Sequence, residues 1–183
     1  MNAYVRTTGN GYKVMCVEGA HILGGSWRNF SAEQRMYDNG GNHHFAIQID
    51  DEFIDVFKSL GFNVGRYEKE DRDGFNYLDI SISWKLRDPG VYLIAHNGVK
   101  TKLDELTVSD LDHNNNIEFA DMELSPHHWT MGGREGVKPY ASNLYIYLGQ
   151  PSISEQRYQE RFGSRQPEPA YEFTPVEDDD IPF

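Results

Sequence analysis

Alternating apolar and polar positions predict that the first 150 residues are rich in β-strands. The clearest alternation runs through 76–84, where Leu78, Ile80 and Ile82 share one face and polar or aromatic side chains share the other. A period of two residues indicates a strand that is buried on one side. The same pattern, or a short apolar run between turn residues, predicts further strands at 12–17, 43–49, 91–95, 117–124 and 142–148.

Helical spacing is confined to short segments. The apolar residues of 53–60 recur at helical intervals between an N-cap at Asp50 or Asp51 and a stop at Gly61, which predicts a helix over 51–60. A weaker helical turn is predicted at 103–111. About six strands and one or two short helices give a mainly β fold. This pattern fits a partly closed barrel or a sandwich and does not separate the two.

The regular pattern stops at Gly149. Segment 151–183 holds five of the eight prolines and few apolar residues, so it cannot bury enough surface to offset the entropy of ordering it. A short helix at 154–162 is compatible with its pattern. We expect one domain at 1–150 and a disordered acidic tail at 151–183.

The charge balance argues at first against nucleic acid. The net charge is −12, of which the tail carries −5 (three arginines against eight acids) and residues 1–150 carry −7 (14 cations against 21 acids). Phosphate binding depends on cationic side chains. Charges are screened beyond about 8 Å at physiological salt, however, so a local cluster of cations can still bind a polyanion.

Other classes of protein receive little support from the sequence. The single cysteine, Cys16, cannot form an internal disulfide, and neither an export signal nor a run of about 18 apolar residues is present. We therefore expect a cytoplasmic protein that is not associated with membranes.

Two histidine pairs suggest a metal site but do not support one. Neighbours on a strand point to opposite faces, so His43-His44 and His127-His128 each offer at most one ligand to a shared site. Segment 132–138 is rich in glycine but lacks the Gly-Lys-Ser/Thr ending of a phosphate loop, and a hairpin fits it better. We expect no enzyme activity, no catalytic residue, no metal and no cofactor.

The most specific signal is the terminal peptide. Four acids, Glu177 to Asp180, precede Ile181 and Pro182, and Phe183 ends the sequence with its own carboxylate. Such a peptide can insert its phenyl ring into an apolar pocket while its carboxylates pair with a basic rim. A tail that served only for solubility would have no reason to end in apolar residues. We interpret Asp178, Asp179, Asp180, Ile181, Pro182 and Phe183 as a tip that binds other proteins.

This tip resembles that of bacterial single-stranded DNA-binding proteins, in which it recruits replication, recombination and repair enzymes. The body is instead similar to single-stranded DNA-binding proteins of tailed phages, which have an OB-like fold. The similar segments are 27–31, 42–46, 61–64 and 136–140. The resemblance implies a partly closed OB-like barrel, single-stranded DNA as partner and the cytoplasm of a bacterial host. No functional residue of the body can be carried over from it.

Sequence-tolerant binding of single strands combines cations with aromatic faces on which bases stack. Three stretches interleave rings and cations, namely 27–37, 75–85 and 129–140. Their candidate DNA-binding residues are Trp27, Arg28, Phe30, Arg35, Tyr37, Phe75, Tyr77, Lys85, Trp129, Arg134, Lys138 and Tyr140.

Alternatives remain open at this point. The chain could be an adaptor that uses the tip to capture or block host replication proteins without binding DNA. A structural or capsid-associated domain would leave the tip unexplained. The tail could also compete with DNA for the groove, and the sequence allows a homo-oligomer without indicating one.

Overall fold

The structure is a computed structural model that describes residues 1–33, 42–69, 72–85, 87–151 and 156–157. The chain divides into two compact units, Met1–Gln150 and Pro151–Phe183. Of the second unit, only Pro151, Gln156 and Arg157 are among the described residues. The expected disorder of the tail, most of the short helix at 154–162 and the terminal tip therefore lie outside the described residues.

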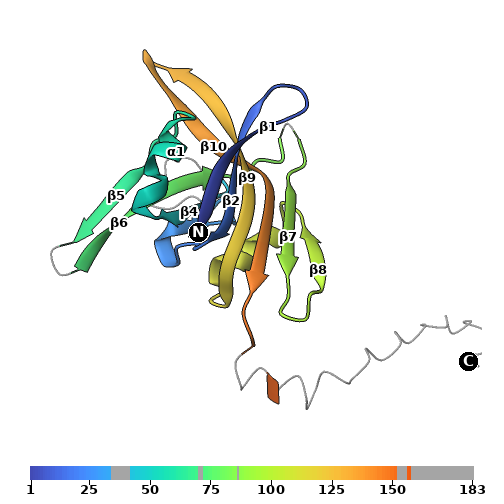
Figure 1. Cartoon of the computed structure of the whole chain (residues 1–183). Coiled ribbons are helices and arrows are strands. Elements are labelled where there is room, and N and C mark those ends of the chain that lie inside the picture. Colours follow the sequence, from blue (N-terminus) through green and yellow to red (C-terminus); the bar gives the residue numbers. More distant parts are fainter. Residues whose placement is uncertain (34–41, 70–71, 86, 152–155, 158–183) are drawn as a thin grey trace, which may run out of the picture. The chain divides into compact units, whose positions relative to one another are not determined.

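The first unit is mainly β, as the pattern predicts. In its described part the ten strands belong to one sheet (Figure 1). The strands are β1 (Asn2–Thr7), β2 (Lys13–Ala20), β3 (Arg28–Asn29), β4 (His44–Ile49), β5 (Gly65–Lys69), β6 (Arg72–Ser81), β7 (Gly90–Ile94), β8 (Lys100–Leu103), β9 (Ile117–Met131) and β10 (Arg134–Leu148). Helical turns are the 3-10 segments η1 (Gly25–Trp27), η2 (Asp51–Phe53) and η3 (Thr107–His113) and the helix α1 (Ile54–Lys58).

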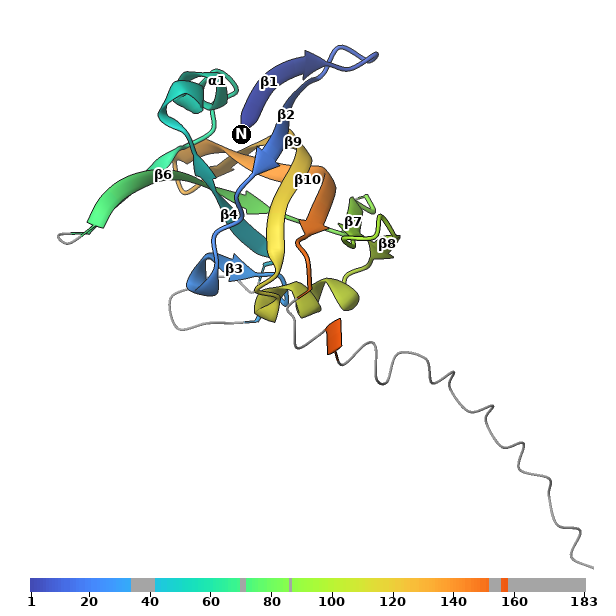
Figure 2. The ribbon, with the colours of Figure 1, turned by 60° about the horizontal axis from the view of Figure 1, so that its bottom comes forward.

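The sheet curls into a partly closed barrel (Figures 1 and 2). Its main path runs β1-β2-β9-β10-β6-β4-β3, while β5 pairs with β6 and the β7–β8 hairpin joins β10. An isolated bridge between Ile22 and Ile47 connects the segment after β2 to β4, which brings the two ends of the path together. The OB-like fold class that the resemblance implies is confirmed.

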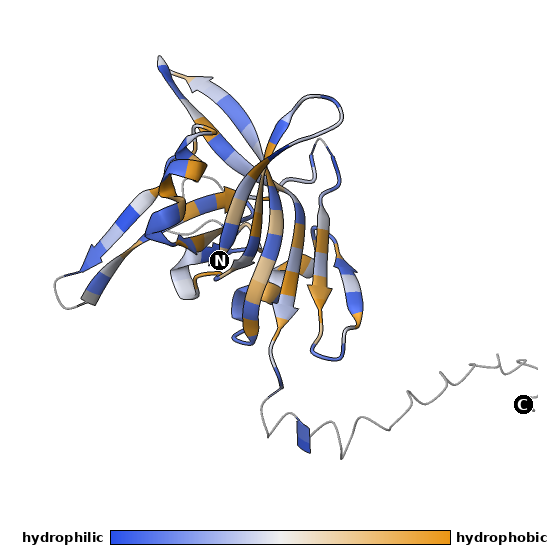
Figure 3. Ribbon diagram, in the orientation of Figure 1, coloured by the Kyte–Doolittle hydropathy of each residue, from blue (hydrophilic) through white to orange (hydrophobic). Residues whose placement is uncertain are grey.

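Alternation places the core as expected. Leu78, Ile80 and Ile82 are buried, and so are Leu144 and Ile146 of β10. Apolar and polar residues alternate along these strands in Figure 3. Burial of the apolar face is the main term that holds the sheet in its curled form. None of the helices in the described part of the chain is long and apolar enough to span a bilayer.

The helix after β4 differs from its prediction. The segment begins as the 3-10 turn η2, and α1 covers only Ile54–Lys58. Asp50 occupies the N-cap position of η2, as predicted, but its side chain makes no capping hydrogen bond there, and the N-cap residue of α1 is Phe53. Asp51 instead accepts a hydrogen bond at 2.5 Å from the side-chain amide of Asn76 in β6. This tertiary contact replaces the local one.

The pattern missed strands that are polar on both faces. β1, β5 and β8 are largely exposed, and pairing with a neighbouring strand rather than burial defines them. β9 and β10 also continue beyond their predicted segments as a long hairpin. The hairpin connection expected in 131–136 is confirmed, because Gly132 and Gly133 turn the chain with φ of 57° and 77°.

Candidate nucleic-acid interface

The outer half of the β9–β10 hairpin carries four of the candidate residues on one face. The register pairs Trp129 with Gly136, His127 with Lys138 and Ser125 with Tyr140, and Met131 faces Arg134 beside the turn. Residues directly opposite each other in an antiparallel pair point to the same side of the sheet. We call this surface the hairpin face: Ser125, His127, Trp129, Met131, Arg134, Gly136, Lys138 and Tyr140. Its protruding end consists mostly of hydrophilic residues (Figure 3).

The two rings of the hairpin face are held in defined positions. A Cβ atom on Gly136 would lie 2.8 Å from Cζ2 of Trp129, so the indole lies across the backbone of the opposite strand. Trp129 is 39% exposed in this position. Tyr140 meets His127 edge to face, with ring centroids 5.4 Å apart. Contacts with the opposite strand therefore hold both rings in place while part of each ring stays accessible to solvent.

A groove of about 500 Å³ lies where the hairpin face meets the segment after β6. One wall consists of Ser125, His127 and Tyr140 of the hairpin, and the other includes Lys85 and Arg87. Both of these cations are exposed. The groove therefore has aromatic and imidazole rings on one side and two cations on the other.

Four cations of the groove and the hairpin face have no carboxylate partner among the described residues. They are Lys85 and Arg87, which line the groove, and Arg134 and Lys138, which lie on the hairpin face. Elsewhere in the described chain several cations are paired: Arg6 with Glu123, Lys102 with Asp88, and Arg66 with Glu68 at 2.9 Å. Unpaired cations can bind phosphates without first breaking an ion pair.

A second group of candidates forms an aromatic cluster on the β5–β6 arm. The ring of Trp27 meets Tyr77 at 4.7 Å, Tyr67 at 5.6 Å and Phe75 at 6.0 Å between centroids. Tyr77 lies across Gly65, where a Cβ atom would come within 2.4 Å of its ring. We call Trp27, Tyr67, Phe75 and Tyr77 the arm cluster.

The arm cluster and the hairpin face are linked by strand β6, which carries Phe75 and Tyr77 and pairs with β10 at Tyr140. Ser81 of β6 is the register partner of Tyr140, four residues after Tyr77. At about 3.3 Å per residue, this spacing places the two positions on the order of 13 Å apart along β6. The structure thus connects Trp27, Phe75 and Tyr77 to the other candidates through one strand.

Two candidates do not fit an interface. Arg28 is 7% exposed, and its guanidinium donates to the backbone oxygen of Leu23 at 2.8 Å and to that of Asn114 at 2.7 Å. Burial lowers the pKa of Arg28, although Asp112 opposes this effect. Phe30 is completely buried and stacks on Phe45 at 5.3 Å. These two side chains belong to the interior and not to a surface that DNA could reach.

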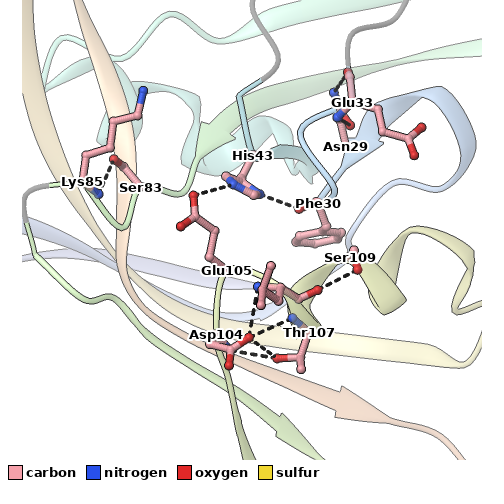
Figure 4. Close-up of polar contacts among 11 residues, drawn as sticks. Asn29, Phe30, Glu33, His43, Ser83, Lys85, Asp104, Glu105, Thr107 and Ser109 are labelled. Carbon is pink, nitrogen blue, oxygen red and sulfur yellow. Dashed lines mark hydrogen bonds and ion pairs between the residues drawn. The ribbon is translucent and has the colours of Figure 1, made fainter.

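Neither the other two candidates nor the two histidines of the 43–44 pair are among the described residues that line the groove. Arg35 and Tyr37 lie outside the described residues. His43 bonds the backbone oxygen of Phe30 at 2.6 Å and Glu105 at 3.3 Å (Figure 4). His44 instead bonds Asp79 at 2.9 Å. The two adjacent imidazoles thus face different partners. Among the described residues, no group of three or more His, Cys, Asp or Glu side chains is arranged to hold a metal ion.

Sequence reasoning overlooked two residues of the groove. Arg87 stands in the Asp88-Pro89-Gly90 turn region, and His127 was considered only as a metal ligand. The sequence did contain a signal for this face. Every second residue on each side of the Gly132-Gly133 turn (127, 129 and 131 before it, and 134, 136, 138 and 140 after it) falls on the same side of a hairpin. This spacing places His127 opposite Lys138 once the hairpin is extended.

A different surface covers the inner half of the same two strands. Asp121 and Glu123 of β9 lie beside Glu18 of β2, and we call these three residues the carboxylate face. The backbone N–H of Gly19 donates to Asp121 at 2.8 Å, and the amide of Asn143 donates to Glu123 at 2.7 Å. Glu18 accepts hydrogen bonds from Asn2 at 3.1 Å and from Tyr4 at 3.2 Å. Internal partners thus bind these carboxylates.

A partly closed OB-like barrel with a groove of cations and rings on its surface places the protein in the class of β-barrel proteins with an OB-like fold. The family is more specific. Residues 7–167 match the sequence model described as a putative phage ssDNA-binding domain. The chain therefore belongs to the family of phage single-stranded DNA-binding domains. No curated protein sequence matches this chain.

One solved structure supports the fold, and two further ones match with lower scores. The single-stranded DNA-binding protein from bacteriophage Enc34, solved in complex with ssDNA, superposes with a TM-score of 0.50 at 6% identity, over 84% of this chain and 95% of that one. A C-terminal truncation of the Enc34 protein gives 0.45 at 8% identity, over 84% and 98%. The single-stranded DNA binding protein gp2.5 encoded by bacteriophage T7 gives 0.35 at 11% identity, over 87% and 94%.

Proposed function

We propose that this protein binds single-stranded DNA without sequence preference, through the hairpin face and the groove at its base. The observation that carries the proposal is a set of four cations without carboxylate partners among the described residues, two in the groove and two on the hairpin face, in a protein whose net charge is −12. Membership of the phage family supports the same ligand. The ssDNA bound in the complex of the Enc34 protein is consistent with it.

Phosphates and bases would be bound by different residues. The phosphates are contacted by Lys85 and Arg87 in the groove and by Arg134 and Lys138 on the hairpin face, because each of these cations lacks a carboxylate partner among the described residues. Trp129 and Tyr140 stack on bases, each stacked base contributing about 1–3 kcal/mol. Every base has an aromatic face, so this mode of binding tolerates any sequence. The arm cluster extends the path along β6.

The proposed contacts imply a moderate dependence on salt. Four phosphate contacts on a single strand give a slope of about −3 in a plot of log affinity against log salt concentration. Repulsion from the acidic remainder of the chain is screened at physiological salt. Stacking adds affinity that does not depend on salt.

A titration with labelled oligo-dT tests the proposal. Fluorescence anisotropy should show saturable binding to a dT oligomer and weaker binding to a duplex of equal length. The adaptor hypothesis expects no binding to either probe. Absence of saturation with the dT oligomer in low salt would overturn the proposed function.

We further propose that the tip, Asp178 to Phe183, recruits replication, recombination or repair enzymes in the cytoplasm of the bacterial host, and that the protein itself catalyses no reaction. The tip's resemblance to that of bacterial single-stranded DNA-binding proteins supports this role. A peptide of residues 177–183 should compete with the bacterial tip for enzymes that bind it, and the same peptide with Phe183→Ala should not. Equal competition by both peptides would contradict the recruitment.

A further inference from the structure

A smaller pocket of about 140 Å³ lies beside the groove. The two cavities share Ser83, Lys85 and Tyr140, so Tyr140 is a wall of both. His43 and Glu105 lie across from Ser83 and Lys85 (Figure 4). A strand that follows the groove must therefore pass the mouth of this pocket.

Two of the residues that line the pocket each have a buried polar atom without a hydrogen-bond partner among the described residues. Among the described residues, the hydroxyl of Ser81 and the indole N–H of Trp84 are buried and make no hydrogen bond. Ser81 is 1% exposed, and both residues line the pocket. A buried polar group without a partner lowers the stability of the folded protein. Such groups are rare in native proteins, and each needs an explanation.

The pocket is too large for one structural water to explain. A water molecule takes up about 30 Å³ in the liquid, so the cavity has room for about five. The opposite walls carry complementary chemistry, because the Trp84 indole only donates, the Ser81 hydroxyl donates or accepts, and the Glu105 carboxylate accepts. A flat ring with both acceptors and an N–H on its edge matches these walls.

We propose that this pocket receives one nucleobase of the bound strand. The inference rests on the proposed function, since the base enters from DNA in the groove. Tyr140, which lines both cavities, packs against the base, while Trp84 and Ser81 donate to carbonyl oxygens on its edge. The energy lost in the free protein by leaving these two donors unpaired is recovered when the base binds.

This inference gives an unusual expectation for Ser81→Ala. The hydroxyl has no partner in the free protein, so its removal should leave the melting temperature equal or slightly higher. The same change should weaken binding to a dT12 oligomer by about fivefold, the typical effect of one hydrogen bond. A substitution that merely damaged the fold would lower both quantities together.

Two controls separate the pocket from general effects. Ser109→Ala removes a hydroxyl that donates to the backbone oxygen of Leu106 at 2.8 Å, away from the pocket (Figure 4). It should leave dT12 binding unchanged. A 12-unit abasic strand keeps the phosphates of dT12 and lacks the bases. Wild type and Ser81→Ala should bind this strand equally.

The outcomes are distinguishable. Fivefold weaker binding of Ser81→Ala to dT12, with equal binding to the abasic strand, supports a base in the pocket. Equal binding of wild type and Ser81→Ala to dT12 would overturn it and leave ordered water as the occupant. An equal loss on the abasic strand would also overturn it, because the hydroxyl would then contact the backbone. If wild type binds no dT12, the proposed function itself fails.

Discussion

The two halves of the β9–β10 hairpin have opposite surface chemistry. On the inner half, Asp121 and Glu123 accept hydrogen bonds from Gly19 and Asn143, and Glu123 also pairs with Arg6. On the outer half, Arg134 and Lys138 have no carboxylate partner among the described residues. The polypeptide is continuous between them, and Tyr140 lies near the boundary.

The aromatic rings follow the same division. On the inner half Tyr145 stacks on Tyr92 at 5.1 Å with the ammonium of Lys100 3.8 Å from the Tyr92 centroid, and Phe119 stacks on Tyr147 at 4.5 Å. Burial and the nearby Asp121 raise the pKa of Tyr147. These rings stack on one another, whereas Trp129 is 39% exposed and Tyr140, which meets His127 edge to face, lines the groove. Net charge and aromatic content alone therefore do not locate a binding surface. The partners that each charge and ring already has are more informative.

The largest expected difference between the halves concerns the rings. Trp129→Ala should weaken binding to a dT oligomer by about tenfold, because it removes one stacking surface worth about 1–3 kcal/mol. Tyr145→Ala on the inner half should leave the affinity unchanged. Anisotropy titrations of both variants measure this difference. Comparable losses in the two variants would remove the distinction between the halves.

The next effect concerns charge. Lys138→Gln should weaken binding and make the slope of log affinity against log salt shallower by about 0.7, since one phosphate contact is lost. Lys102→Gln is the matched control, because Lys102 is exposed and already paired with Asp88. Its affinity and slope should match wild type. A salt slope that Lys138→Gln leaves intact would exclude Lys138 as a phosphate contact.

A smaller effect tests how Trp129 is positioned. In Gly136→Ala the new Cβ atom would lie 2.8 Å from the indole, so the ring must tilt away from the strand. We expect about a twofold loss of dT affinity, a part of the stacking contribution. Gly9→Ala serves as control, because a Cβ atom there meets nothing within 4 Å. If the two alanine variants bind equally, the position of the indole is unimportant.

The smallest effect separates stability from binding. Hydrogen bonds from Thr107 and from the backbone N–H of Leu106 hold the pKa of Asp104 below its ordinary value. A carboxyl with a lowered folded-state pKa stabilises the protein above its unfolded pKa and loses that effect as pH falls through the folded pKa. Asp104→Asn should therefore lower the denaturation midpoint at pH 7, with the difference vanishing in acid.

Asp104 belongs to neither half of the hairpin, so this variant should bind dT oligomers like wild type. Denaturant titrations from pH 7 into acid, together with one anisotropy titration at pH 7, check both statements. A stability difference that persists in acid would show that ionisation of Asp104 is not its cause.

Sequence reasoning succeeded where burial on one face determines the structure. The alternation in 76–84 correctly identified Leu78, Ile80 and Ile82 as core residues because the strand has one solvent face. It missed β5 and the outer half of the hairpin, which bury little apolar surface and are defined mainly by strand pairing. Four residues of this outer half were nevertheless predicted as DNA-binding candidates, since rings and cations alternate there, and that role stays a prediction.

The misassigned candidates show the complementary limit. Arg28 and Phe30 are of residue types that commonly bind DNA. In the structure, however, Arg28 donates hydrogen bonds to the carbonyl oxygens of Leu23 and Asn114, and Phe30 stacks on the ring of Phe45. These partners are distant in sequence or depend on the turn around η1. The sequence could not predict the base pocket for the same reason, because Ser81, Trp84 and Glu105 line one cavity only in the folded barrel.

Photo-crosslinking tests the central claim most directly. The whole protein is bound to an oligomer that contains 5-bromodeoxyuridine and irradiated, and the crosslinked residues are identified by mass spectrometry. If the outer half of the hairpin binds the strand, adducts will form at Trp129 and Tyr140 and will be absent from Tyr145 and Tyr147. Adducts confined to Tyr145 and Tyr147 would contradict the account.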